Sequence, residues 1–304
     1  MFYYVAGGRI IKGMKYFPCA KINLGLNVVA KRADGYHDLE TVFYPVGVYD
    51  ELDVRISDVP GCHLDIEGVD FLCPSHNNLV VKAYELLSSH YALPGIDVIL
   101  AKHIPTQAGM GGGSSDGAYM IRALNEVCSL GMSTDQMQQY ASQLGADCPF
   151  FITSQPAYAE GIGDKLSPIN FSEQSYLFEH HNLILIKPDV AVSTREAYSG
   201  ITPHNASHNC REVVESTPIS GWRGLLTNDF EDSIFVKLPI LKAVKDAMYA
   251  SGATYASMSG SGSTIYGLFP DTINQHDLLT QSNISQYANK YFFQFITQEA
   301  EDRH

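Results

Sequence analysis

Four of the five residues from Gly109 to Gly113 are glycine. Core packing does not explain this run, because glycine has no side chain to bury and loses more backbone entropy on folding than any other residue. A run without side chains lets the backbone approach a ligand closely, so that successive N–H groups face one anion. Apolar residues then recur at helical spacing over Asp116–Leu130, which predicts that the anion lies at the positive N-terminal end of a helix.

The wider segment Pro105–Asp116 has the composition of a phosphate-binding loop. Its serine hydroxyls add donors for phosphate oxygens or ligands for a metal ion. The segment lacks the Gly-Lys-Ser/Thr ending of a P-loop and differs from the dinucleotide-binding fingerprint. The alternative, a flexible glycine linker, does not explain the apolar helical face that follows. We therefore predict an ATP site at Pro105, Gly109, Met110, Gly111, Gly112, Gly113, Ser114 and Ser115.

A second glycine-rich segment, Gly260-Ser261-Gly262-Ser263, lies between two strand-like runs. Taken alone, a tight β-hairpin explains it equally well. Together with the first loop, Gly260, Ser261 and Gly262 are candidates for further contacts with ATP.

Three polar residues are candidates for chemistry. Lys21 and Asn23 lie two apart in an otherwise apolar strand and so share one face. A buried lysine there would need a carboxylate or phosphate partner, whereas a lysine at a solvated edge would need none. Asp147 follows the end of a predicted helix, where a simple turn aspartate is the alternative.

The 304 residues suggest two domains, and both strand and helix periods occur along the chain. We predict an ATP-binding domain over residues 1–172 and a substrate-binding α+β domain over residues 173–304. Residues 1–13, upstream of Met14, are expected to be a disordered extension. Predicted strands lie at 20–30, 40–48, 51–56, 97–100, 183–187, 255–259 and 264–269, predicted helices at 78–90, 116–130, 133–144 and 234–251, and a surface loop at 202–217.

The net charge of −13 disfavours general affinity for nucleic acid or anionic membranes. The chain has neither an apolar run long enough to span a membrane nor a signal peptide pattern. The six cysteines form no Cys-x-x-Cys pair, which favours reduced thiols over a zinc site or a disulfide framework. These features predict a cytoplasmic protein, either a monomer or a weak homodimer, whose partners are small molecules.

Three blocks resemble, in order and spacing, the motifs of the GHMP kinases: Pro18–Leu24, Gly109–Asp116 and Met258–Ser263. Two further blocks, Arg32–Phe43 and Gly145–Phe151, are similar to those of the 4-diphosphocytidyl-2-C-methyl-D-erythritol kinases within that family. The resemblance runs from about residue 16 to about residue 269. It implies a two-lobed α+β GHMP kinase fold with the active site in the cleft between the lobes.

The resemblance also implies an activity. Such an enzyme uses ATP with Mg²⁺ to phosphorylate the 2-hydroxyl of a cytidine diphosphate ester, 4-diphosphocytidyl-2-C-methyl-D-erythritol, in the non-mevalonate (methylerythritol phosphate) isoprenoid precursor pathway. The alternatives are a mevalonate, homoserine or sugar kinase on the same scaffold, which leaves the Tyr36-His37 block unexplained, and a non-catalytic nucleotide or sugar sensor. A sensor would be expected to lack Lys21 or Asp147, and both are present.

Residue roles follow from the same resemblance. Lys21 and Asp147 would be catalytic, with Asp147 as general base or orienting acceptor. Substrate contacts are expected from Asn23, Tyr36, His37, Thr194 and Tyr198. The sequence offers no extra carboxylate for the metal, so Mg²⁺ is expected on ATP and Ser115. Two departures, Cys19 and Asp116, remove no catalytic atom, and Asp116 is expected to cap the helix after the loop.

Overall fold

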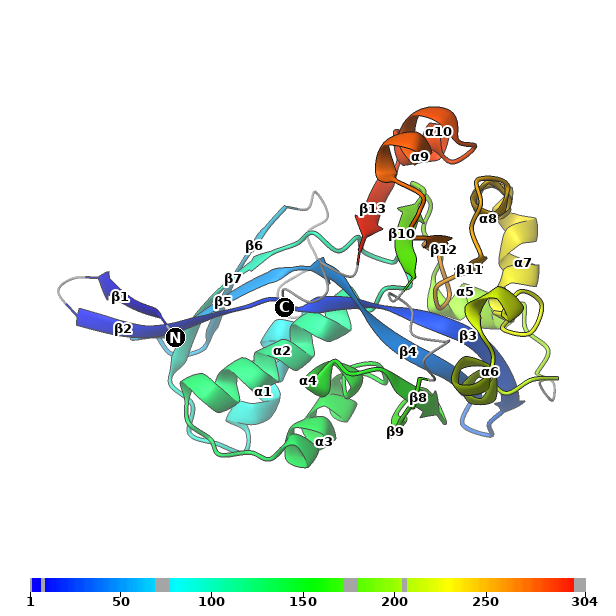
Figure 1. Ribbon diagram of the computed structural model, residues 1–304. Helices are drawn as coiled ribbons and strands as arrows, with labels where there is room; N and C mark the ends of the chain where they lie inside the picture. Colours follow the sequence, from blue (N-terminus) through cyan, green and yellow to red (C-terminus); the bar gives the residue numbers. More distant parts are fainter. Residues whose placement is uncertain (1, 7–8, 69–76, 172–179, 204–206, 298–304) are drawn as a thin grey trace. The chain divides into compact units, whose positions relative to one another are not determined.

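The protein combines helices and β-sheets in two compact units (Figure 1). The computed structural model describes residues 2–6, 9–68, 77–171, 180–203 and 207–297. The first unit contains residues 1–20, 48–106 and 111–155, and the second contains residues 21–47, 107–110 and 156–304. The predicted α+β class is confirmed.

The first unit has one five-stranded sheet in the order β1-β2-β5-β7-β6. Its strands are β1 (Phe2–Ala6), β2 (Arg9–Tyr16), β5 (Glu51–Ser57), β7 (Gly95–Ala101) and β6 (Cys62–Glu67). Strand β6 runs parallel to β7, and the other neighbours are antiparallel. Along β5, Leu52 and Val54 are buried, while Asp53 and Arg55 on the opposite face form a salt bridge of 2.9 Å. One face of the sheet is therefore apolar and carries the helices.

The α-helices described in the first unit are α1 (Leu79–Ser88), α2 (Gly112–Val127), α3 (Thr134–Leu144) and α4 (Phe150–Thr153). Helix α1 packs against β6 and α2, and α2 packs against β5. The Asn78 side chain caps α1 by accepting from the Val80 N–H at 2.9 Å. Ser133 and Gln136 form a reciprocal capping box at the start of α3, so the predicted start of this helix is confirmed.

The second unit has two four-stranded sheets, in the orders β11-β12-β10-β13 and β3-β4-β8-β9. The first consists of β11 (Tyr255–Met258), β12 (Ile265–Pro270), β10 (His181–Lys187) and β13 (Phe292–Ile296). The other consists of most of β3 (Cys19–Lys31) and β4 (His37–Tyr49), with β8 (Ala157–Glu160) and β9 (Lys165–Pro168). All of the predicted strands are present in the structure.

The helices of the second unit are α5 (Thr194–Ser199), α6 (Cys210–Ser216), α7 (Phe230–Lys237), α8 (Pro239–Ala250), α9 (Gln275–Gln281) and α10 (Ser285–Ala288), with a 3₁₀ turn, η2 (Ile219–Gly221). Helix α8 packs on β11 and β12. Its buried Leu241, Val244 and Met248 share a core with Ile184 and Ile186 of β10. This core supports the turn between β11 and β12, which belongs to the candidate site.

Two predictions about this unit are wrong. The helix predicted over residues 234–251 is two helices, because Pro239 has no N–H group and starts a new helix at its first position. The loop predicted over residues 202–217 contains helix α6. Asn209 caps that helix by accepting from the N–H groups of Arg211 and Glu212, so its polar character signals a helix start rather than a loop.

The structure also bears on the predictions for residues 1–13 and for the domain boundary. Residues 2–6 pair with residues 9–13 in an antiparallel hairpin, so the expected disordered extension is strand in these residues. The domain boundary predicted between residues 172 and 173 falls at the edge of residues 172–179, which lie outside the described residues, and it stays a prediction. The compact units divide the chain differently, since residues 21–47 belong with the C-terminal half.

We expect Ser133→Ala to lower the free energy of unfolding by about 1 kcal/mol, because it removes a side-chain cap from α3. Chemical denaturation monitored by circular dichroism measures this. Ser142→Ala is the matched control, because the Ser142 hydroxyl donates to the Gln139 carbonyl in the exposed interior of the same helix and caps nothing. Equal losses in the two variants would contradict the capping role.

Candidate active site

The second half of the glycine run forms the start of a helix in the first unit. Gly111 is the N-cap of α2 with φ of 70°, a left-handed conformation that favours glycine, and Gly112 is the first helical residue. Among the described residues no side chain caps this helix. Gly113 is exposed, and Ser114 is half-buried beside it. The N–H groups of the first turn are therefore available to an anion, at the positive end of a 16-residue helix.

The first half of the run packs within the second unit. The Met110 carbonyl accepts from the Lys21 N–H at 3.0 Å, and the Ala108 carbonyl accepts from the Thr264 N–H at 3.1 Å. Gly109 has φ of 74°, and a Cβ on it would overlap the carbonyl oxygen of Ser259. Glycine is required here because backbone lies directly against backbone.

The second glycine segment is the turn between β11 and β12. Gly260 and Gly262 have φ of 53° and 91°, and the Gly262 N–H donates to the Ser259 carbonyl at 2.9 Å. The hairpin interpretation is thus correct for the local structure. The Ser259 hydroxyl donates to the Gly109 carbonyl at 2.8 Å, so the two glycine segments that were predicted to act together meet in this unit.

Lys21 and Asn23 lie beside these turns, on one face of β3. The Lys21 ammonium donates to the Asn23 Oδ1 at 2.6 Å and lies 4.8 Å from the centre of the Phe43 ring. Asn23 makes two further hydrogen bonds. Its Nδ2 donates to the Thr41 hydroxyl at 3.0 Å, and its N–H donates to the Ser259 hydroxyl at 3.3 Å. Lys21 is only 4% exposed, so the interpretation as a solvated edge lysine is wrong.

Asp147 lies in the first unit, in the turn between α3 and α4. The next residue, Cys148, is buried, and its N–H donates to the Gly145 carbonyl at 3.1 Å. Burial raises the pKa of the Cys148 thiol to about 12, with the Asp147 carboxylate adding to the rise and a hydrogen bond with Ser114 opposing it. Asp147 and the Ser114 end of the glycine run are therefore neighbours of the same thiol.

A buried charge cluster, which the sequence analysis missed, lies behind the start of α2. The Lys102 ammonium bonds to Asp50 and, at 2.7 Å, to Asp116. Asp50 also accepts from the N–H groups of His103 and Ile104, and all three charged side chains are less than a tenth exposed. The expectation that Asp116 caps the helix is wrong, because Gly111 is the N-cap and the Asp116 carboxylate binds Lys102.

Two buried oxygens near the start of α2 are of interest for metal binding. The Ser115 hydroxyl and the Asp116 Oδ1 are buried without a hydrogen-bond partner among the described residues. The described part of the chain also contains no group of three histidine, cysteine or carboxylate side chains that would hold a metal ion alone. An oxygen ligand at Ser115 suits Mg²⁺, which usually binds few protein ligands and takes the rest from phosphate and water.

The residues predicted to bind the cytidine end lie in the second unit. The His37 ring stacks on Tyr198 with 4.9 Å between ring centres and 17° between planes. Tyr198 in turn meets Phe230 edge to face at 4.9 Å. Tyr36 is 62% exposed on the turn before β4, and Thr194 is exposed at the first position of α5. The structure therefore brings His37 and Tyr198 together and leaves Tyr36 and Thr194 on the surface.

Glu40, in the same sequence block, was also missed. Its carboxylate is 9% exposed and accepts from Asn27 Nδ2 at 2.6 Å, the Tyr158 hydroxyl at 2.8 Å and Asn209 Nδ2 at 2.5 Å. This network ties β3, β4, β8 and the cap of α6 together. The sequence around Glu40 does not indicate that its carboxylate is the centre of a buried hydrogen-bond network.

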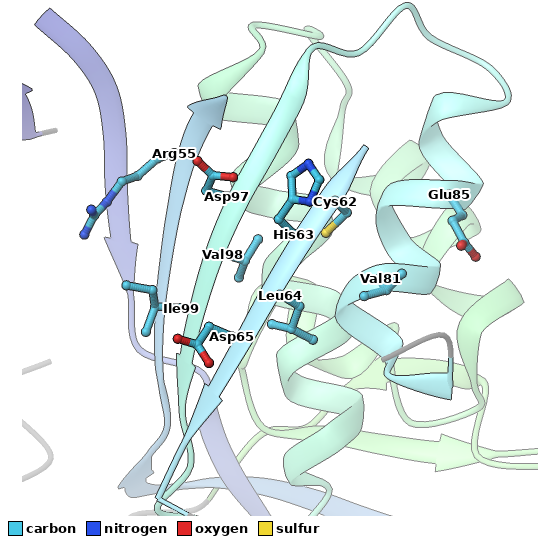
Figure 2. Close-up of a pocket in the computed structure, with 10 residues that line it drawn as sticks. All are labelled: Arg55, Cys62, His63, Leu64, Asp65, Val81, Glu85, Asp97, Val98 and Ile99. Carbon is cyan, nitrogen blue, oxygen red and sulfur yellow. The ribbon is translucent and has the colours of Figure 1, made fainter. Parts of the chain in front are cut away.

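A pocket of about 660 Å³ lies in the first unit, lined by residues of β5, β6, β7 and α1 (Figure 2). His63, Asp65 and Asp97 are among its polar residues. None of the predicted site residues lines it. Pro105, the remaining predicted ATP contact, is half-buried after Ile104 and also lies outside this pocket.

Comparison with known proteins agrees with the motifs. The family described as GHMP kinases N terminal domain matches residues 78–155, and GHMP kinases C terminal matches residues 215–281. A curated 4-diphosphocytidyl-2-C-methyl-D-erythritol kinase of Bacteroides fragilis is 47% identical over 255 residues, which are 83% of this chain and 91% of the relative. The enzyme of that name from Bacteroides thetaiotaomicron is 49% identical over the same shares. The chain belongs to this kinase family.

Solved structures support the same family. A crystal structure of 4-(cytidine 5'-diphospho)-2C-methyl-D-erythritol kinase matches with a TM-score of 0.75 and 29% identity, and the match covers 93% of this chain and 98% of that one. Methanococcus jannaschii mevalonate kinase matches with a TM-score of 0.68 at 13% identity over 93% of this chain and 98% of that one, which shows the fold alone. The predictions of a GHMP kinase fold and of an ATP-dependent small-molecule kinase are confirmed.

Over the described ranges, no helix is both long and apolar enough to cross a bilayer.

The buried cluster generates a prediction about pH. Burial raises the pKa of Asp116 from 3.8 to about 7, although the Lys102 ammonium opposes the rise. Because the folded pKa lies above the unfolded one, the native state binds more protons between these values, and this group's contribution to stability falls as pH rises from about 4 to 7. Asp116→Asn removes this dependence, so the variant should gain stability relative to the wild type as pH rises from 5 to 8.

Urea denaturation at several pH values measures this difference. Asp135→Asn removes an exposed carboxylate from α3 and is the matched control, with an unchanged slope against pH expected. A stability difference between Asp116→Asn and the wild type that stays constant over this range would contradict the prediction.

Proposed function

We propose that this chain transfers the γ-phosphoryl group of ATP to the 2-hydroxyl of 4-diphosphocytidyl-2-C-methyl-D-erythritol, giving the 2-phosphate and ADP. The observation that carries the proposal is the buried Lys21–Asn23 pair beside two backbone turns that only glycine allows. Relatives 40–49% identical carry the name of this activity. Mevalonate and homoserine kinases, at 13% and 18% identity, share the fold alone, so neither alternative is favoured.

In this proposal the backbone holds the nucleotide. The N–H groups from Gly111 to Ser114 bind phosphate oxygens at the start of α2, helped by the partial positive charge of the helix. The turn between β11 and β12 supplies further N–H groups at Gly260 and Ser261, since the Gly262 N–H is bonded to the Ser259 carbonyl. Phosphoryl transfer depends mainly on positioning and on electrostatic stabilisation, which are what fixed backbone donors provide.

Asp147 and Lys21 act on the reacting groups. Asp147 accepts the proton of the substrate hydroxyl while the hydroxyl oxygen bonds to the γ-phosphorus. The bond between the γ-phosphorus and the ADP oxygen breaks in the same step. Lys21 offsets negative charge on the transferred phosphoryl group. Its hydrogen bond to Asn23 and its place over Phe43 fix the ammonium in one position, which reduces reorganisation during the reaction.

The part of the site that binds the cytidine end of the substrate is proposed to recognise the cytosine base. Tyr36 and His37 offer an aromatic face and an imidazole, with Tyr198 stacked on His37 and Thr194 at the start of α5. A flat base with hydrogen-bonding edges suits such a set. Asn23 is proposed to contact the diphosphate or the polyol of the substrate.

Mg²⁺ is the proposed metal, held by ATP oxygens, water and the Ser115 hydroxyl. The fit rests on that buried hydroxyl, which lacks a partner among the described residues at the start of α2. When bound, the ion would neutralise phosphate charge. We further propose that the protein works in the cytoplasm as a monomer or weak homodimer.

A coupled assay of ADP release tests the substrate. With ATP, Mg²⁺ and a panel of hydroxyl substrates, we expect turnover of 4-diphosphocytidyl-2-C-methyl-D-erythritol and a kcat/KM at least about a thousandfold lower for mevalonate and homoserine, because neither carries a base for the aromatic set. Turnover of mevalonate or homoserine without turnover of the cytidine ester would overturn the proposal.

Asp147→Asn tests the catalytic assignment. We expect it to fold normally, to bind ATP with unchanged affinity and to lose about 10²- to 10⁴-fold in kcat, because an amide does not accept the proton. Steady-state kinetics and isothermal titration calorimetry measure these effects. Asp135→Asn, with the same change of charge on the surface of α3, is the control. A near-normal kcat for Asp147→Asn would remove this residue from the mechanism.

A further inference from the structure

Asn228 lies just before α7 and is held against strand β3. The Leu26 N–H donates to the Thr227 carbonyl at 2.8 Å, and the Asp229 N–H donates to the Leu26 carbonyl at 2.9 Å. The Asp229 carboxylate accepts from the Val28 N–H at 2.7 Å. These bonds pin the backbone on both sides of Asn228, whose side chain is 4% exposed.

The carboxamide of Asn228 spans three backbone groups. Its Nδ2 donates to the Met258 carbonyl at 2.7 Å and to the Gly260 carbonyl at 2.8 Å, and its Oδ1 accepts from the Phe230 N–H at 3.0 Å. Both donor hydrogens and the acceptor are therefore used. Two carbonyls on one side and an N–H on the other also fix which end of the amide is nitrogen.

The two carbonyls lie on either side of Ser259, at the end of β11 and the first glycine of the second turn. A trans peptide is planar, and its C=O and N–H groups point in opposite directions. Holding the Gly260 carbonyl toward Asn228 therefore directs the N–H of Ser261 away from Asn228. One side chain thus sets the orientation of a backbone donor in the turn that was assigned to ATP.

A second contact keeps β11 from shifting against Asn228. The Glu231 carboxylate accepts from the Met258 N–H at 2.8 Å and from the Ser257 hydroxyl at 3.0 Å, and it forms a salt bridge of 2.5 Å with Lys245. The segment from Asn228 to Glu231 therefore bonds both polar groups of the Met258 backbone. The glycine turn starts from a fixed strand end, although glycine itself gives it no stiffness.

We propose that Asn228 is a positioning residue for ATP, acting through the glycine turn rather than by touching the nucleotide. Its carboxamide holds the Gly260 carbonyl so that the Ser261 N–H points at a phosphate oxygen. This inference rests on the proposed function, which assigns the turn from Gly260 to Gly262 to ATP. A preorganised donor costs no ordering when the nucleotide binds, and a mobile turn would lose affinity for that reason.

Asn228→Asp tests this with the smallest change in shape. The carboxylate keeps the acceptor for the Phe230 N–H but sets an oxygen against two carbonyl oxygens. We expect the affinity for a non-hydrolysable ATP analogue to fall about tenfold or more, the KM for ATP to rise in parallel, and the KM for 4-diphosphocytidyl-2-C-methyl-D-erythritol to stay within about twofold. Asn228→Ala should show the same selective loss, and it carries the test if the aspartate variant does not fold.

Asn182→Ala is the matched control. Asn182 is a buried asparagine of β10 in the same unit, and its Nδ2 donates to the Ile273 carbonyl at 3.3 Å, as an ordinary structural bond. We expect this variant to lose stability without losing affinity for the ATP analogue. If the Asn228 variants keep wild-type affinity for the analogue, or if Asn182→Ala loses as much affinity as they do, the positioning role is wrong.

Hydrogen exchange measured by mass spectrometry separates this inference from the proposed function. In the wild type, the peptide that covers residues 259–264 should gain protection when the ATP analogue binds, and in Asn228→Asp that gain should be lost at saturating analogue. No gain in the wild type would overturn the assignment of the turn to ATP and the role of Asn228 with it. A gain that Asn228→Asp retains in full would overturn the role of Asn228 alone.

Discussion

The site depends on backbone lying directly against backbone at Gly109. A Cβ on this residue would overlap the Ser259 carbonyl oxygen, and the Ser259 hydroxyl closes the contact by donating to the Gly109 carbonyl at 2.8 Å. This contact joins the two glycine segments within the second unit, next to the Lys21–Asn23 pair. The following residues, from Gly111, then start α2 with no side chain over its first N–H groups in the described part of the chain. Glycine at these positions is a steric requirement and leaves backbone donors free for an anion.

The backbone of the candidate site is held by side chains outside the set that we propose to bind ligands. Asn228 and Glu231 fix the end of β11, and Asp50 with Lys102 fixes the strand end and the segment before the glycine run. Asn228, Asp50 and Lys102 are buried and Glu231 is partly buried. Each is bonded to backbone or to an opposite charge, which is the condition under which burial of a polar group is tolerated. Glycines thus permit close backbone approach, and hydrogen bonds from these polar side chains restrain the backbone that glycine leaves flexible.

The sequence predicted the elements whose physical signal is local. Apolar alternation located β3, β5 and β7, and the Ser133–Gln136 pair located the start of α3. The glycine segments and Lys21 were recognised because each breaks a packing rule in a way that only close backbone approach or a buried partner explains. The break at Pro239 was missed because the apolar helical spacing continues across it, and α6 was missed because capping residues and loop residues are the same types.

The buried polar network could not be predicted from the sequence, for a different reason. Lys102 lies 52 positions along the chain from Asp50 and 14 from Asp116. Asn228 lies 30 and 32 positions from the residues whose carbonyls it binds. A single sequence does not show which distant polar residues meet, so Asp116 was assigned a local role as a cap that the structure replaces with an ion pair. Long-range pairing of polar groups is fixed only by the complete fold.

The central claim is that main-chain N–H groups at the start of α2 hold the phosphates of ATP. A crystal structure of the protein with a non-hydrolysable ATP analogue tests it most directly. We expect phosphate oxygens within hydrogen-bond distance of the N–H groups from Gly111 to Ser114. A nucleotide bound elsewhere, with these N–H groups contacting only water, would contradict it.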